Sequence, residues 1–157
     1  MTREHLIPLL DQYRAGLDAE LMLLHRLQAI AVEQRRVSQT GSVADLHRAV
    51  DDRDRVLATL VTVEHELRGV RQMLHAGRDW LAELPMFQEI VERHKEAASL
   101  VADIIGVDRD SLEALKEAEL ARRVAAQSLE QGESTLAAYR RIVSPDLTPA
   151  TLVNRRG

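Results

Sequence analysis

The chain has 157 residues, a formal net charge of −4 and no cysteine, which excludes disulfides, thiol catalysis and cysteine-ligated zinc. Aromatic residues make up only 3% of the chain and charged residues 29%, so the composition favours helices packed along aliphatic seams over a β-sandwich. No apolar run approaches the roughly 20 residues of a membrane span, and the first residues lack the pattern of a secretory signal. We therefore expect a cytoplasmic protein with one domain and no membrane insertion.

The first predicted helix covers residues 3–38. Its apolar residues recur at spacings of three, four or seven, which is typical of an amphipathic helix with a near-heptad period. They are Leu6, Leu10, Tyr13, Leu17, Leu24, Leu27 and Ala31. Pro8 lies early in this stretch, and proline is tolerated in a first helical turn, so a start near Ile7 is an alternative.

A second helix is predicted over residues 43–76. Gly41 and its small polar neighbours end the first helix, and Ser42, with Asp45 three residues later, is expected to cap the second. The apolar stripe of the second helix is Leu46, Val50, Leu57, Leu60, Leu67, Val70 and Leu74. A short loop between two long helices predicts an antiparallel helical hairpin.

The segment after the hairpin is expected to be a break, with Gly77 as a helix cap and Pro85 as a second interruption. Between them, Trp80, Leu81 and Leu84 are expected to plug the end of a helical bundle.

A third helix is predicted over residues 86–143, which contain no proline. Its stripe is Phe87, Ile90, Val91, Ala97, Val101, Ile104, Leu112, Leu115, Leu129 and Leu136. Asp110 and Glu113 have capping-box spacing after Gly106, so a break near 106–110 is an alternative, and Gly132 is a second candidate for a break. A single glycine costs only about 1 kcal/mol against alanine, which favours one continuous helix. The predicted fold class is all-α, an antiparallel hairpin plus a long C-terminal helix in an elongated bundle or coiled coil.

Residues 144–157, "SPDLTPATLVNRRG", are expected to form a flexible tail beyond the bundle domain of residues 1–143, because Pro145 and Pro149 exclude a helix. From residue 120 onward six arginines stand against three acids, giving +3 and leaving −7 for the rest of the chain. This asymmetry is typical of an interacting tail. Arginines that complement a helix dipole are an equal alternative.

No constellation of residues points to catalysis. None of the six histidines follows a glutamate by three residues, and no glycine-rich phosphate loop or nucleophile elbow occurs. His47 with Asp51, and His75 with Asp79, have the spacing of half a metal site, but a solvated polar face is the preferred interpretation. We expect that the chain is not an enzyme and that it binds no metal and no cofactor. An acidic chain without an aromatic platform also argues against nucleic acid as a partner.

Two stretches carry a resemblance to a known family. The stretch "LHRLQAIAVEQRRVSQTGSVADLHRAVDDRDRVLATLVTVEHELRGVRQML" resembles the first helical hairpin of FlgN-type flagellar export chaperones. The end of the chain is also similar, with a helix closing on "LAAYRR", a Pro-containing linker and a terminal "LVNRRG". The resemblance implies a cytoplasmic chaperone that binds helical ends of flagellar hook-associated or filament-cap proteins and delivers them to the type III export gate.

The resemblance also implies roles for residues near the C-terminus. An apolar helical face would bind the client protein, and the tail, which is apolar but broken by prolines, is expected to fold onto the same partner. The expected client-binding residues are Leu129, Leu136, Ile142, Val143, Leu147 and Leu152. Tyr139 is expected to dock on the export apparatus. The alternative to a chaperone is a homodimeric coiled coil whose third helix pairs with itself.

Overall fold

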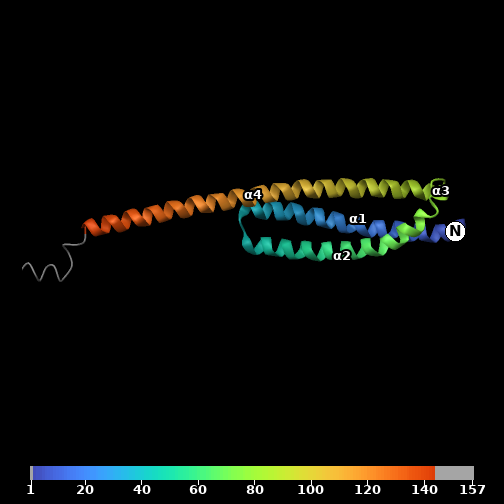
Figure 1. The fold of residues 1–157 in the computed structure, drawn as a ribbon, viewed down its shortest axis with the longest axis horizontal. Helices are drawn as coiled ribbons and strands as arrows, with labels where there is room; N and C mark the ends of the chain where they lie inside the picture. The colour runs from blue at the N-terminus through green and yellow to red at the C-terminus, as the bar shows by residue number, and fades with distance from the viewer. Residues whose placement is uncertain (1, 144–157) are drawn as a thin grey trace, which may run out of the picture. The chain divides into compact units, whose positions relative to one another are not determined.

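The computed structural model describes residues 2–143, and all of the regular structure in this range is helical (Figure 1). The helices are α1 (Arg3–Thr40), α2 (Val43–His75), α3 (Arg78–Leu81) and α4 (Pro85–Val143). The all-α prediction is therefore confirmed, including the hairpin and the long C-terminal helix. The chain divides into two compact units, Met1–Leu115 and Lys116–Gly157. The expected tail, residues 144–157, lies outside the described residues.

Within the first unit, α1 lies between α2 and the beginning of α4 (Figure 1). Ion pairs give the direction of α4. Arg14 Nη1 lies 3.1 Å from Glu89 Oε2, and further along both helices Arg35 Nη1 lies 3.5 Å from Asp110 Oδ2. Because the residue numbers rise together, α1 and α4 are parallel, while the two-residue connection after α1 makes α2 antiparallel to both.

The core is formed mainly by α1, whose heptad-like stripe is buried as predicted. One buried cluster lies towards the α3 end and comprises Leu6, Leu10, Tyr13, Leu17, Leu67, Val70, Leu74, Leu81 and Ile90. A second comprises Leu21, Leu24, Leu27, Ala31, Val56, Leu100 and Ile104. Fully burying an aliphatic side chain of this kind contributes about 1.5–3 kcal/mol to stability.

Of the two expected helix caps, Gly41 has the chemistry that the sequence indicated and Ser42 does not. Gly41 has φ 74° and donates its backbone N–H to the Val37 carbonyl, which ends α1 in a left-handed cap that a Cβ would strain. Ser42 occupies the N-cap of α2, but its hydroxyl donates to Asp45 Oδ2 at 2.9 Å and makes no side-chain bond to a backbone N–H.

The start of α1 differs from the alternative that Pro8 suggested. The helix begins at Arg3, so Pro8 is inside it, and proline removes the N–H that would bond to the Glu4 carbonyl. Leu6 is completely buried and packs against Gly77, where an added Cβ would lie 2.6 Å from a Leu6 methyl carbon. This packing holds the turn before Pro8 in helical conformation.

The connection from α2 to α4 corrects two further expectations. The C-cap of α2 is Ala76, whereas Gly77 has φ −105° and precedes α3, so Gly77 is not a left-handed helix cap. Leu81 is buried and Leu84 packs against the same cluster, as predicted. Trp80 does not plug the bundle, because 58% of its surface is exposed. It lies one residue before Leu81 in a short helix, so the two side chains leave the backbone in different directions.

Helix α4 begins with Pro85 at its first position and continues through Gly106 and Gly132 without a break. Neither glycine has a positive φ. The predicted stripe is buried only in part, since Ile90 and Ile104 are covered while Leu112 and Leu115 are exposed.

Candidate functional site

The part of α4 in the second unit exposes apolar side chains, and it includes several of the residues that the sequence indicated for binding. Leu129 is 74% exposed, Leu136 69% and Tyr139 64%. Every residue from 121 to 141 is exposed. A monomeric protein scatters single apolar residues over its surface, but a row at helical spacing is typical of a surface that another helix covers.

These side chains share one face of the helix. At 3.6 residues per turn, positions 125, 129, 132, 136 and 139 fall within a sector of roughly 80°. We call this sector the Leu129–Tyr139 face; it consists of Ala125, Leu129, Gly132, Leu136 and Tyr139. Two of the expected client-binding leucines, Leu129 and Leu136, therefore occupy the same surface as the expected gate-docking Tyr139.

Two further apolar residues of this helix, which the sequence analysis did not single out, are also exposed. Val124 lies roughly 100° from the middle of the Leu129–Tyr139 face, and Leu120 lies roughly 140° from it. Leu120 is 63% exposed, nearly as much as Leu136. It therefore provides a leucine of similar exposure on the opposite side of the same helix.

A shallow hollow of about 640 Å³ follows the face, and Gly132 forms its notch because it has no side chain. Its lining is Ser128, Leu129, Gly132, Glu133, Leu136, Ala137 and Arg140. Glu133 and Arg140 place one negative and one positive charge at its border. The other expected client-binding residues cannot be placed in this surface. Ile142 and Val143 belong to α4, but their side chains lie outside the described part of the chain, as do Leu147 and Leu152 entirely.

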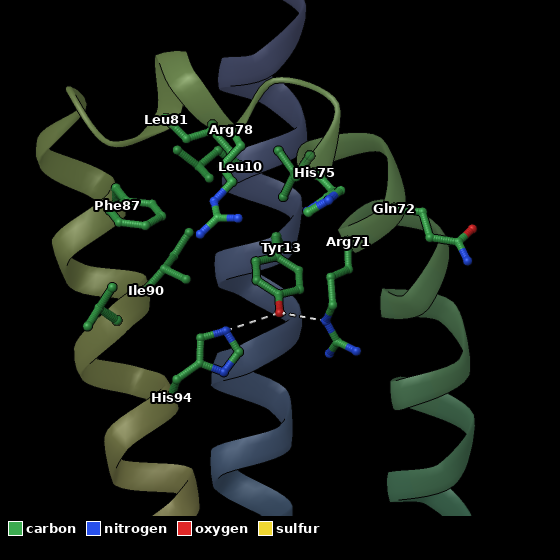
Figure 2. Close-up of a pocket in the computed structure, with 12 residues that line it drawn as sticks. Leu10, Tyr13, Arg71, Gln72, His75, Arg78, Leu81, Phe87, Ile90 and His94 are labelled. Carbon is green, nitrogen blue, oxygen red and sulfur yellow. Dashed lines mark hydrogen bonds between the residues drawn. The ribbon is translucent and has the colours of Figure 1, made fainter.

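A second feature, in the first unit, is a polar network around a buried tyrosine (Figure 2). Tyr13 is only 5% exposed. Its hydroxyl accepts a hydrogen bond from Arg71 Nε at 3.0 Å and lies 3.1 Å from His94 Nε2. Burial, followed by the Arg71 charge, lowers the pKa of His94. The neutral imidazole can therefore accept a hydrogen bond from the Tyr13 hydroxyl.

Two glutamates extend this network. Arg71 donates to both carboxylate oxygens of Glu64, at 2.7 and 3.2 Å, and this pairing is the main reason that the pKa of Glu64 falls to about 2. Glu20 is 9% exposed, and burial, followed by its hydrogen bond with Glu64 and that carboxylate's charge, raises the pKa of Glu20 to about 7. Oε1 of Glu20 is buried without a hydrogen-bond partner within the described range.

The position of Glu20 in the sequence is itself a signal that its side chain is buried. Glu20 lies three residues after Leu17 and four before Leu24, so it falls on the apolar stripe of α1. His94 stands in a highly charged stretch of the sequence, residues 92–96, yet its Nε2 lies 3.1 Å from the Tyr13 hydroxyl. The partners Glu64 and Arg71 are seven residues apart on α2, and only the packing of α2 against α1 brings them to Glu20.

Next to this network, α2, α3 and α4 surround a hollow of about 570 Å³ above α1, here called the Tyr13 hollow (Figure 2). Its lining residues are Leu10, Tyr13, Arg71, Gln72, Leu74, His75, Arg78, Leu81, Phe87, Ile90, Val91 and His94. This size is in the range of ligand-binding sites.

Among the described residues, no group of three or more histidines, aspartates and glutamates has the arrangement to hold a metal ion. Within the same range, no helix is both long enough and apolar enough to cross a membrane.

Comparisons with known proteins give no relative. No family model matches the chain, and neither do any curated protein or solved structure. The geometry alone defines the class of protein, which is a helical protein with an exposed apolar helix face.

Proposed function

We propose that this chain is a protein-binding module that holds an amphipathic helix of another protein against the Leu129–Tyr139 face. The observation that carries the proposal is the exposure of Leu129, Leu136 and Tyr139 on one sector of α4. Amphipathic helices recognise such rows through apolar anchors at spacings of three, four and seven residues.

The energetics support a modest but useful affinity. Burying a leucine fully contributes about 1.5–3 kcal/mol, and the face offers two leucines and a tyrosine. Association costs several kcal/mol in lost translational and rotational freedom. Because residues 116–141 are already helical, less conformational entropy is lost on binding than for a disordered segment.

The specific function we propose is that of a flagellar export chaperone, as the resemblance to the FlgN-type family implies. The clients would be the helical ends of hook-associated or filament-cap proteins, which the chaperone would keep from assembling early and deliver to the type III export gate. Tyr139 would dock on the gate. Since Tyr139 shares a face with Leu136, client binding and gate docking would compete, and docking would favour release of the client.

One observation supports a second candidate function, a coiled-coil homodimer. Ala118, Ala125 and Gly132 follow one another at intervals of seven residues beside the Leu129–Leu136 row. Small residues at heptad spacing allow two helices to approach closely. In this case the partner of the face would be the same face of a second copy.

The test uses two single substitutions in the full chain. Leu136→Ser changes the face, and Leu120→Ser is the matched control on the other side of the helix. Binding of a purified hook-associated protein is measured by isothermal titration calorimetry, and self-association by sedimentation velocity at micromolar concentration. The chaperone proposal predicts binding that Leu136→Ser weakens about tenfold or more and Leu120→Ser leaves unchanged.

Equal binding by both variants would show that the client uses another surface. A wild-type dimer that only Leu136→Ser dissociates, together with no binding to hook-associated or filament-cap protein, would replace the chaperone proposal by the homodimer.

A further inference from the structure

The Tyr13 hollow combines apolar walls with a basic border. Its apolar residues are Leu10, Leu74, Leu81, Phe87, Ile90 and Val91. Its polar residues include two arginines and two histidines, and no carboxylate belongs to the lining. A hollow of this composition fits an apolar group that has a negative charge beside it.

The two arginines are not equivalent. Arg71 already uses all three of its nitrogens, with Nε bonded to Tyr13 and both Nη atoms to Glu64. No carboxylate in the described part of the chain pairs with Arg78. In Figure 2 the Arg78 side chain extends into the hollow, towards the space between Phe87 and Tyr13. Arg78 is therefore the cation that an occupant can neutralise.

The position of the hollow indicates the shape of the occupant. α2 and α4 lie on either side of α1 in both views, and the hollow opens between them (Figures 1 and 2). Gln72, His75 and Arg78 on its border are exposed, so the site is an open groove and not an enclosed cavity. Antiparallel bundles of four helices bury such a groove with one more helix.

We propose that the Tyr13 hollow docks an acidic amphipathic helix of a partner protein. A leucine or phenylalanine of this helix is seated against Phe87 and Ile90, and an aspartate or glutamate one turn away pairs with Arg78. The site belongs to the first unit, whereas the Leu129–Tyr139 face belongs to the second. The chain thus has two separate docking surfaces. The proposal for the Tyr13 hollow does not depend on the function proposed for the Leu129–Tyr139 face.

The experiment uses the full chain and a pair of synthetic peptides of about 18 residues, long enough to be helical in an alanine-rich host. Both peptides carry leucines at i, i+4 and i+7, with glutamate at i+3 in one and lysine in the other. Binding is measured by fluorescence anisotropy, and amide shifts of the ¹⁵N-labelled protein locate the site. The variants are Arg78→Gln and Phe87→Leu, with Arg68→Gln as an exposed control on α2 outside the lining.

The expected result is that the glutamate peptide binds at micromolar Kd and shifts the amides around residues 71–94. We expect Arg78→Gln to weaken binding about five- to tenfold, Arg68→Gln to leave it unchanged and the lysine peptide to bind at least tenfold more weakly. Circular dichroism checks that each variant keeps the wild-type helix content.

Three results would overturn the proposal. One is equal binding of the two peptides, and another is binding that Arg78→Gln does not change. The third is binding of dodecanoate that depends on Arg78 while neither peptide binds, because the occupant would then be a small amphipathic anion. Amide shifts confined to residues 125–139 would mean that the peptide occupies the Leu129–Tyr139 face, and they would count against this site alone.

Discussion

Glu20 makes the stability of the first unit depend on pH, and replacing it by glutamine should remove that dependence. The pKa of Glu20 is raised from 4.5 to about 7, mainly by burial and then by Glu64. Between these two pH values the native protein keeps a proton that the unfolded chain has released. The contribution of protonated Glu20 to the free energy of unfolding is therefore fully present below about pH 4.5 and declines as the pH rises towards 7. The Glu20→Gln side chain is neutral at every pH and its amide can still donate to Glu64.

The magnitude follows from the shift. A difference of about 2.5 pKa units corresponds to at most about 3.4 kcal/mol. Glu64 is exposed enough for water to screen the pair, so we expect about 1–2 kcal/mol. The pKa of Glu64 is lowered to about 2, so its contribution is lost only as the pH falls below about 4.5 and is constant between pH 5 and 8. Glu20→Gln should thus be about 1–2 kcal/mol more stable than the wild type at pH 8 and close to it at pH 5.

The assay is urea unfolding followed by circular dichroism at pH 5, 6, 7 and 8, with the free energy of unfolding compared between variant and wild type. His94 has a lowered pKa, so its contribution is lost as the pH falls through its ordinary range, and comparing the two proteins cancels it. Glu83→Gln, an exposed glutamate before α4, is the control and should leave the pH dependence unchanged. A Glu20→Gln variant that is less stable than the wild type at pH 8 would refute the reasoning, because Glu20 would then stabilise the fold as an anion.

Two substitutions test the packing of the first unit. A Cβ at Gly16 would lie 2.1 Å from Leu67 Cδ2, whereas a Cβ at Gly69 would meet nothing within 4 Å. Gly16→Ala should therefore destabilise the protein by about 1–2 kcal/mol, and Gly69→Ala should stabilise it by about 0.5–1 kcal/mol. Both changes are measured from the midpoints of urea unfolding. Stabilisation by both substitutions would mean that α1 and α2 are not in close contact at this point. Asp108→Asn should lower the free energy of unfolding by about 1–3 kcal/mol at both low and high salt. The reason is that Arg53 donates to both Asp108 oxygens, at 2.7 and 2.6 Å, in a partly buried pair. A loss of stability seen only at low salt would indicate that the pair is a solvent-screened surface interaction.

The sequence predicted the helices well because their determinants are local. The end of α1 at Gly41 depends on one residue that accepts a positive φ, and the continuity of α4 depends on the lack of proline from residue 86 to residue 143. These features do not require knowledge of what packs against them. They could therefore be read from spacing and residue type alone.

The sequence predicted the core and the binding surfaces less well because periodicity shows only that an apolar face exists. Ile104 and Leu115 belong to the same stripe of α4, but Ile104 is buried by α1 and α2 while Leu115 is exposed. The Tyr13 network was missed for the same reason, since Glu64 and His94 come from two different helices. Trp80 shows the opposite error, because a large aromatic residue was expected to be buried and is not.

The second unit's helix keeps its conformation by local interactions, which bears on how it would bind. Arg123 Nη2 lies 2.7 Å from Glu119 Oε1 one turn earlier, and the helix contains alanines at 121, 125, 126, 137 and 138. Such pairs contribute about 0.3–0.5 kcal/mol each, so they support a helix without defining a partner. The Leu129–Tyr139 face is thus presented in the helical form before anything covers it. Under the proposed function, little entropy would be lost in ordering this surface when a partner helix binds. The specificity would then depend on how the partner's side chains fit Gly132 and the charges of Glu133 and Arg140.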